Sequence, residues 1–165
     1  MNMPQDRIIY LLVSLFFFCQ TTLLGQSTTK IEKMEALSFM VGDWVGTSKV
    51  YKDGQVDNEV PAFQKISYDL NKHIIVIELQ SKLLQLHTII YYDEESGQYV
   101  YNPYSERGVR KSPASLKDGK FVVAASETNR FVFSRTSKDT FQEYGKKLTD
   151  GEWTRYFEDN FKDIQ

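Results

Sequence analysis

The sequence predicts an all-β protein, a closed antiparallel up-and-down barrel of about ten strands with a short helix before the first strand. Three observations predict this fold class. Turn-forming dipeptides recur along the chain, and they supply the positive φ that tight hairpins need. The segments between them are rich in aromatic and β-branched residues. No helical crossover separates these segments, so a parallel sheet is disfavoured.

The turns divide the chain into ten segments with strand character. The turn dipeptides are Asp53-Gly54, Ser96-Gly97, Asp118-Gly119 and Asp150-Gly151. The predicted strands are residues 44–52, 60–69, 73–82, 84–92, 98–103, 108–116, 120–126, 129–135, 139–147 and 152–162. Closing so many strands into a barrel removes exposed edges and leaves an interior wider than side chains readily fill, so an internal cavity is expected. A two-sheet sandwich is the architectural alternative.

The N-terminal segment predicts export. Residues 1–25 are interpreted as a signal peptide and residues 26–165 as one barrel domain. A weakly positive start precedes the uncharged apolar residues 8–18, a run too short to cross a bilayer as a helix. The small residue Gly25 favours cleavage before Gln26, and we expect no membrane span after the signal is removed.

A lipoprotein signal is the minority alternative, in which Cys19 becomes the lipid-anchored first residue of the mature protein. Bulky Phe18 stands where lipoprotein signals carry a small residue, which disfavours this alternative. Cys19 is the single cysteine, so residues 26–165 contain no disulfide, no thiol nucleophile and no thiolate metal site. Export without disulfides indicates a bacterial periplasmic or secreted protein.

Composition narrows the function classes. The net charge is −2, which gives no reason to expect nucleic acid as a partner. No phosphate-binding glycine loop, metalloprotease motif or serine-hydrolase elbow occurs, so no catalytic residue, metal site or cofactor is assigned. Oligomeric state is left open by the sequence.

Residues 26–40 carry the one convincing helical pattern after the signal. Ile31, Met34 and Leu37 recur at helical spacing, and Gly42 ends the segment. In the strand that follows, Trp44 shares a face with small residues, while Lys49 lies on the opposite, outward face. We therefore expect Trp44 to point inward and to plug the end of the barrel that the helix covers.

Several segments resemble a known group of barrels. These are LSFMVGDWVG at residues 37–46, TDGEWTRYFEDNF at residues 149–161, Tyr92-Asp93 and Glu143-Tyr144-Gly145. In order and spacing they are similar to lipocalins and other calycins, and to the exported bacterial domain-of-unknown-function family 1579. The resemblance implies a ten-stranded barrel with no established activity.

The same resemblance implies structural roles for Gly42, Trp44, Trp153 and Arg155. Related lipocalins place a basic residue of the last strand over the first-strand tryptophan. Arg155 is the closest candidate for that position, with Lys162 as the substitute. An ordinary core tryptophan without a stacked cation is the alternative.

A candidate cavity lining follows from inward-facing polar and aromatic residues. The candidates are Trp44, Tyr68, Glu78, His87, Tyr91, Tyr99, Tyr101 and Arg130. Tyrosines crowd the middle of the chain and suit a flat amphipathic ligand, although aromatic strand preference alone is the favoured explanation. An outward, solvated Glu78 is slightly favoured over an inward one, and Glu78, Arg130 and Glu143 form a polar anchor only if two of them face inward. His87 lies in an apolar strand, and an outward or hydrogen-bonded role is favoured over haem ligation.

Three functions remain open at this point. The favoured one is binding of a small apolar or amphipathic molecule inside the barrel. A filled barrel that serves as a protein-interaction or structural module of the envelope is the second. An enzyme that uses Glu78, His87 or Arg130 inside the barrel is the third and least favoured.

Overall fold

The structure is a computed structural model that describes residues 29–164. The predicted export signal, its cleavage after Gly25 and the lipidation of Cys19 all lie outside the described residues. Within them, no helix is long and apolar enough to cross a membrane.

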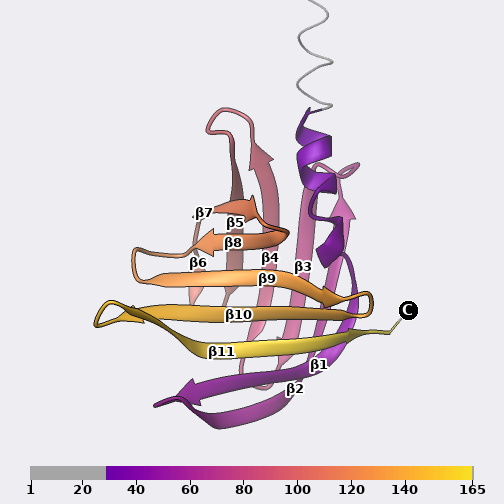
Figure 1. The fold of residues 1–165 in the computed structure, drawn as a ribbon. Helices are drawn as coiled ribbons and strands as arrows, with labels where there is room; N and C mark the ends of the chain where they lie inside the picture. The colour runs from indigo at the N-terminus through magenta and orange to yellow at the C-terminus, as the bar shows by residue number, and fades with distance from the viewer. Residues whose placement is uncertain (1–28, 165) are drawn as a thin grey trace, which may run out of the picture.

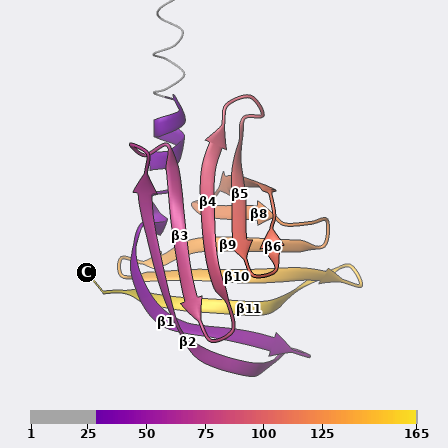
Figure 2. The same cartoon turned by 180° about the vertical axis from the view of Figure 1, so that it is seen from behind.

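The strands form one continuous antiparallel sheet that closes on itself (Figures 1 and 2). Their bounds are β1 Gly42–Lys52, β2 Gln55–Asp69, β3 Ile74–Ser81, β4 Gln85–Asp93, β5 Gln98–Ser105, β6 Gly108–Val109, β7 Ser112–Lys117, β8 Lys120–Ala124, β9 Asn129–Ser137, β10 Thr140–Thr149 and β11 Glu152–Asp163. The order β4-β3-β2-β1-β11-β10-β9-β8-β7-β5 is closed by pairing of β4 with β5, and the two-residue β6 pairs only with β5. The predicted barrel of ten strands is confirmed.

The aspartate–glycine turns behave as the sequence predicts. Asp53-Gly54, Asp118-Gly119 and Asp150-Gly151 each have positive φ at both residues, and they join β1 to β2, β7 to β8 and β10 to β11. This geometry matches the right-handed twist of the flanking strands. Because each hairpin joins neighbours in the sheet, the turns also determine most of the strand order.

Two predicted strands differ from the observed ones by more than a residue or two at their ends. The second strand begins at Gln55 rather than at residue 60, because the tight turn lets Lys52 pair with Gln55 at once. The predicted strand 108–116 is split into β6 and β7, and between them the amide of Arg110 donates to the carbonyl of Pro103. This break leaves Arg110 at the rim of the barrel.

The predicted N-terminal helix is present and covers one end of the barrel (Figure 1). Residues 29–35 are α-helical, and the 3-10 helix η1 (Ser38–Met40) follows. Met34, Leu37 and Met40 are fully buried against the barrel core. Burial of these three apolar side chains stabilises the docked helix, because so short a helix is not stable by itself.

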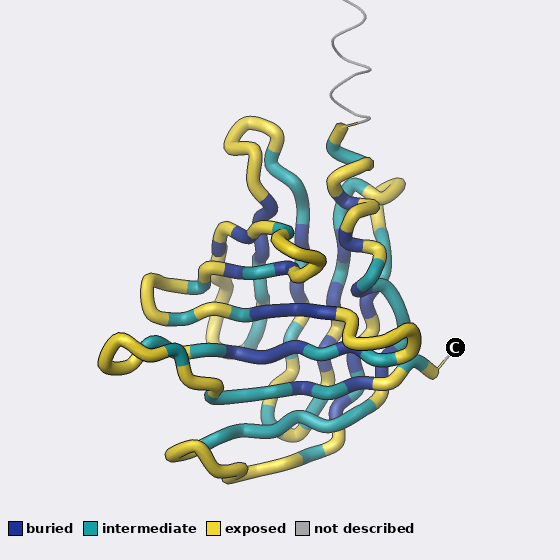
Figure 3. Tube along the Cα trace, viewed as in Figure 1, coloured by how far each residue is buried: buried dark blue, intermediate teal, exposed yellow. Residues whose placement is uncertain are grey.

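The barrel interior is layered from the helix towards the other end. Phe141 pairs with Phe161 nearest the helix, Glu143 pairs with Asp159 in the middle, and Gly145 pairs with Phe157 beyond them. Figure 3 shows buried positions concentrated in the central parts of the strands and exposed positions at the hairpin tips. The helix end is therefore packed with aromatic rings, and the opposite end is where space remains.

Candidate functional site

Trp44 plugs the helix end of the barrel, as expected from its face of β1. Its side chain is fully buried, its Nε1 donates to the carbonyl oxygen of Met40 at 2.9 Å, and its ring stacks on Phe141 with centroids 5.1 Å apart. Gly42 makes room for the indole, because a Cβ there would lie 3.0 Å from the Trp44 ring. The cation near the ring is Arg135 of β9, at 5.5 Å from the centroid.

The expectation that Arg155 stacks on Trp44 is wrong. Trp44 pairs with Asp163 at the end of β11, whereas Arg155 pairs with Lys146 towards the start of that strand. The Arg155 guanidinium instead lies 4.2 Å from the ring centroid of Tyr144 and forms an ion pair with Glu158. The substitute is not observed over the ring either, because Lys162 is exposed on the strand position next to buried Phe161.

Two of the candidate tyrosines hold the helix rather than line an open cavity. The Tyr99 hydroxyl donates to the carbonyl oxygen of Lys33 at 2.7 Å, and the Tyr68 hydroxyl donates to that of Met34 at 3.3 Å. Burial raises the pKa of Tyr99 to about 12, so its hydroxyl stays protonated as a donor. These bonds satisfy carbonyl groups at the C-terminal end of the helix.

Four candidate cavity residues face outward, so their assignment to the cavity is wrong and the outward alternative favoured for Glu78 and His87 is the one observed. Glu78 and His87 are exposed and lie opposite each other on the outer surface of β3 and β4. Tyr91 follows buried Ile90 and so lies on the outer face of β4. Exposed Arg130 stacks on Trp153, with its guanidinium 4.3 Å from the ring centroid. Their neighbours along the strands take the inward positions, because successive side chains alternate between faces.

A cavity of about 270 Å³ occupies the end of the barrel remote from the helix. Tyr101 is the one predicted candidate that lines it. Most of its wall is apolar or aromatic, formed by Leu84, Leu86, Tyr101, Pro103, Phe131, Tyr156 and Phe157. Glu143 is the carboxyl that reaches it, and Arg107 and Arg110 lie at its mouth.

A buried polar cluster, formed by Gln64, Glu143 and Asp159, lies under the cavity floor. Each residue is at most 5% exposed. Glu143 and Asp159 are directly opposite each other on β10 and β11, and Gln64 Nε2 donates to Glu143 Oε2 at 3.2 Å across the barrel. Gln64 Oε1 and Asp159 Oδ1 have no hydrogen-bond partner. Such unsatisfied buried atoms are costly, and in native proteins they call for a structural or functional reason.

Desolvation dominates the electrostatics of this cluster. Burial, with Asp159 nearby, raises the pKa of Glu143 to about 8. Burial also raises the pKa of Asp159 to about 6, against the opposing effect of the Ser48 hydroxyl. Burial and the Glu143 carboxyl raise the pKa of Tyr101 above its ordinary value. Glu143 is therefore mostly protonated at neutral pH when the cavity holds no charged molecule.

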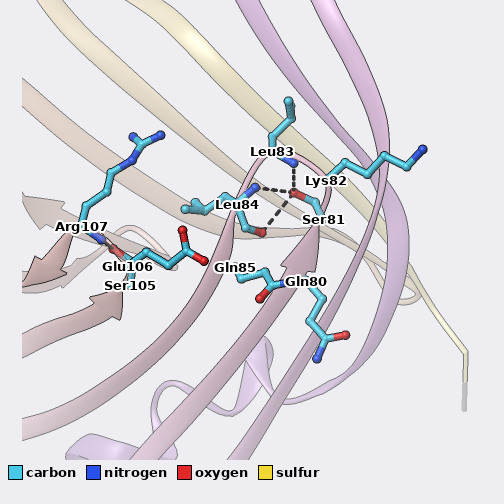
Figure 4. A pocket seen from close by; sticks show the side chains of 9 residues that line it. All are labelled: Gln80, Ser81, Lys82, Leu83, Leu84, Gln85, Ser105, Glu106 and Arg107. Carbon is cyan, nitrogen blue, oxygen red and sulfur yellow. Dashed lines mark hydrogen bonds between the residues drawn. The ribbon is translucent and has the colours of Figure 1, made fainter.

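The rim of the cavity is formed by two turns. Figure 4 shows the β3–β4 turn beside the β5–β6 turn, with Ser81 Oγ accepting hydrogen bonds from the amides of Leu83 and Leu84. A shallow pocket of about 500 Å³ lies between the turns and shares Leu84 and Arg107 with the cavity wall. The rim pocket is therefore the outer part of the same opening.

Glu143 was among the polar residues expected to form an anchor only if two of them faced inward, whereas its partners Gln64 and Asp159 were not predicted. The alternation of side chains along each strand indicates that both face inward. Asp159 lies two residues from Phe157 and from Phe161, and Gln64 lies two residues from Ala62 and from Ile66. Polar residues flanked at both i±2 positions by apolar ones share the buried face. No group of three or more metal-ligating side chains is found among residues 29–164.

The fold and the cavity define a ten-stranded antiparallel barrel with a covered end and an open one. No known family model matches the chain, and no curated protein matches it. Among solved structures it is similar to a protein of unknown function of the DUF3598 family from Nostoc punctiforme, with 8% identity, a TM-score of 0.28, and coverage of 79% of this chain and 98% of that one. A likeness at this TM-score carries no argument about function.

Proposed function

We propose that the barrel binds one small, largely apolar molecule that carries a polar end group. One observation carries the proposal: the interior has an aromatic-lined cavity of about 270 Å³ with the buried carboxyl of Glu143 at its floor. Ligand sites in proteins combine mostly apolar walls with a few placed polar groups, and this cavity is near the lower end of their usual size. In a barrel filled by its own side chains, unsatisfied polar atoms beneath such a space would lower the free energy of unfolding without any compensating interaction.

Two adjacent alanines allow a matched test of cavity binding. Ala125 lines the cavity, whereas Ala124 is exposed on the outer face. Ligand-detected NMR with 2-phenylethanol, a neutral aromatic alcohol, reports occupancy without regard to charge. Wild type and Ala124→Phe should bind the alcohol, and Ala125→Phe should lose binding because its ring occupies the space. Equal binding by the two variants, or none by wild type, would refute cavity binding.

We further propose that the barrel is of the lipocalin-like calycin type and that residues 1–25 direct its export to the periplasm or beyond. The Gly-x-Trp segment supports the first part, since Trp44 plugs the covered end. The apolar run before Gly25 supports the second. Native mass spectrometry of the exported protein tests both export and ligand retention. A mature chain that starts at Gln26 is expected, and an acylated Cys19 at its start would contradict cleavage after Gly25.

A further inference from the structure

The polar cluster under the cavity has too few hydrogen-bond donors for its acceptors. Glu143, Asp159 and Gln64 present five side-chain oxygen atoms. The Gln64 amide donates to Glu143, and the Ser48 hydroxyl donates to Asp159. Gln64 Oε1 and Asp159 Oδ1 remain without partners, on side chains that are 1% and 2% exposed. A molecule that brings N–H donors to this floor would correct the imbalance, whereas one that brings only acceptors would worsen it.

The cluster also lacks a positive charge. The ion pairs among residues 29–164 join Lys49, Lys72, Arg135 and Arg155 to surface carboxylates, and none includes Glu143 or Asp159. Buried carboxyls are usually paired, because an isolated buried charge is very costly. Burial without a cationic partner raises the pKa of Glu143, and a cation in the cavity would supply the partner that lets this carboxyl ionise.

The cavity wall suits such an occupant. Tyr101, Phe131, Tyr156 and Phe157 line the same space as Glu143. Aromatic rings attract ammonium groups through their negative faces, most strongly where water is excluded. The same rings would also contact the apolar part of the molecule. One aromatic wall therefore suits both its ammonium group and its apolar part.

From these contacts we infer that the molecule bound in the cavity carries an ammonium group at its inner end, paired with Glu143 and assisted by Asp159. This inference rests on the proposed cavity-binding function. Arg107 and Arg110 at the mouth disfavour a second positive charge there, so the outer end is uncharged or anionic. The ligand class is thus a small aromatic or aliphatic monoamine, rather than a polyamine or a fatty acid.

Binding of an amine has a proton balance that binding of an alcohol lacks. The ammonium pairs with ionised Glu143, so the proton that Glu143 holds in the free protein is released to solvent on binding. The ionisable groups that interact with Glu143 are Asp159 and Tyr156 of β11 and Tyr101 of β5. Glu158 in turn interacts with Asp159, and Arg110 interacts with Tyr156. Amine affinity should therefore rise between pH 6 and pH 8, as the carboxyls lose their protons more readily.

Calorimetry with three probes of similar size tests the charge preference: 2-phenylethylamine, 2-phenylethanol and 3-phenylpropionate. The charged hydrogen bond should make the amine bind wild type about tenfold or more tightly than the alcohol at pH 8. Glu143→Gln should remove this preference and the proton release while it keeps alcohol binding. Glu78→Gln, a carboxyl on the outer surface, should keep both. If Glu143→Gln does not fold, Asp159→Asn takes its place.

The outcomes separate the two proposals. Alcohol binding without amine preference would overturn the ammonium inference and leave cavity binding intact. Tighter binding of the propionate, or an amine preference that survives Glu143→Gln, would also overturn it. Binding of no probe at all would refute both proposals.

Discussion

The free energy of unfolding should fall as the pH rises from 5 to 8, and Glu143 should cause most of the change. Its carboxyl is 5% exposed, and burial raises its pKa from 4.5 to about 8. The folded state therefore holds the proton more tightly than the unfolded chain does. Between the two pKa values the folded protein binds more protons than the unfolded chain, so stability is lost as the pH rises.

The magnitude follows from the pKa difference. Each unit corresponds to about 1.4 kcal/mol, and integration from pH 5 to pH 8 gives a loss of about 3 kcal/mol. Asp159, whose pKa is raised to about 6, changes stability in the same direction at the acidic side of this range. A loss of this size is a substantial part of the roughly 5–15 kcal/mol that stabilises a typical domain.

Urea unfolding at pH 5, 6, 7 and 8 measures the effect. Glu143→Gln is expected to be more stable than wild type at pH 8 by about 3 kcal/mol and nearly equal at pH 5. Glu78→Gln removes an exposed carboxyl and controls for the general loss of one negative charge. Parallel pH profiles for wild type and Glu143→Gln would show that Glu143 is not held neutral, and the reasoning about the polar cluster would fail.

Three further predictions concern packing and the outer surface. Trp44→Ala removes a fully buried ring and should lower the free energy of unfolding by about 3–5 kcal/mol. Tyr99→Phe removes one hydrogen bond to the helix and should lower it by about 1 kcal/mol. The urea unfolding midpoints of the two variants test this ranking. Gly46→Ala should lower the free energy of unfolding by about 3 kcal/mol or prevent folding, because its Cβ would lie 1.8 Å from the carbonyl oxygen of Asn160. Soluble yield and thermal melting test this. A melting temperature equal to that of wild type would contradict the close approach of β1 and β11. Haemin should show no saturable Soret shift that depends on His87, since this side chain is exposed on the outer surface; loss of such a shift in His87→Ala would contradict this.

The local part of the fold could be predicted from the sequence. Asp53-Gly54, Asp118-Gly119 and Asp150-Gly151 specify hairpin turns because few other residue pairs adopt positive φ at both positions without strain. The aromatic and β-branched segments between turns specify strands, and short connections make them neighbours. The inward position of Trp44 was also predictable, since Lys49 marks the opposite face of the same strand.

Prediction failed where one residue decides between the two faces of a strand. Glu78 and Leu79 are neighbours, yet one is exposed and the other lines the core. A shift of one residue exchanges the faces, and the pairing of IIVIELQ with its neighbouring strands decides which residues face inward. The expected stacking of Arg155 on Trp44 failed for a related reason: the register of β11 against β1 places Asp163, not Arg155, beside the tryptophan.

By itself the sequence determined the strands, their order, the helix and the tryptophan plug, because each depends on residues close together in the chain. The candidate site forms only when the barrel closes, because its residues come from strands that are far apart in the sequence. Gln64 and Glu143 are separated by 79 positions and meet only because β2 and β10 lie on either side of the β1–β11 pair. The same registers set Glu143 opposite Asp159 and leave the space above them unfilled. Their burial, raised pKa values and missing donors are properties of that shared interior, which no single strand contains.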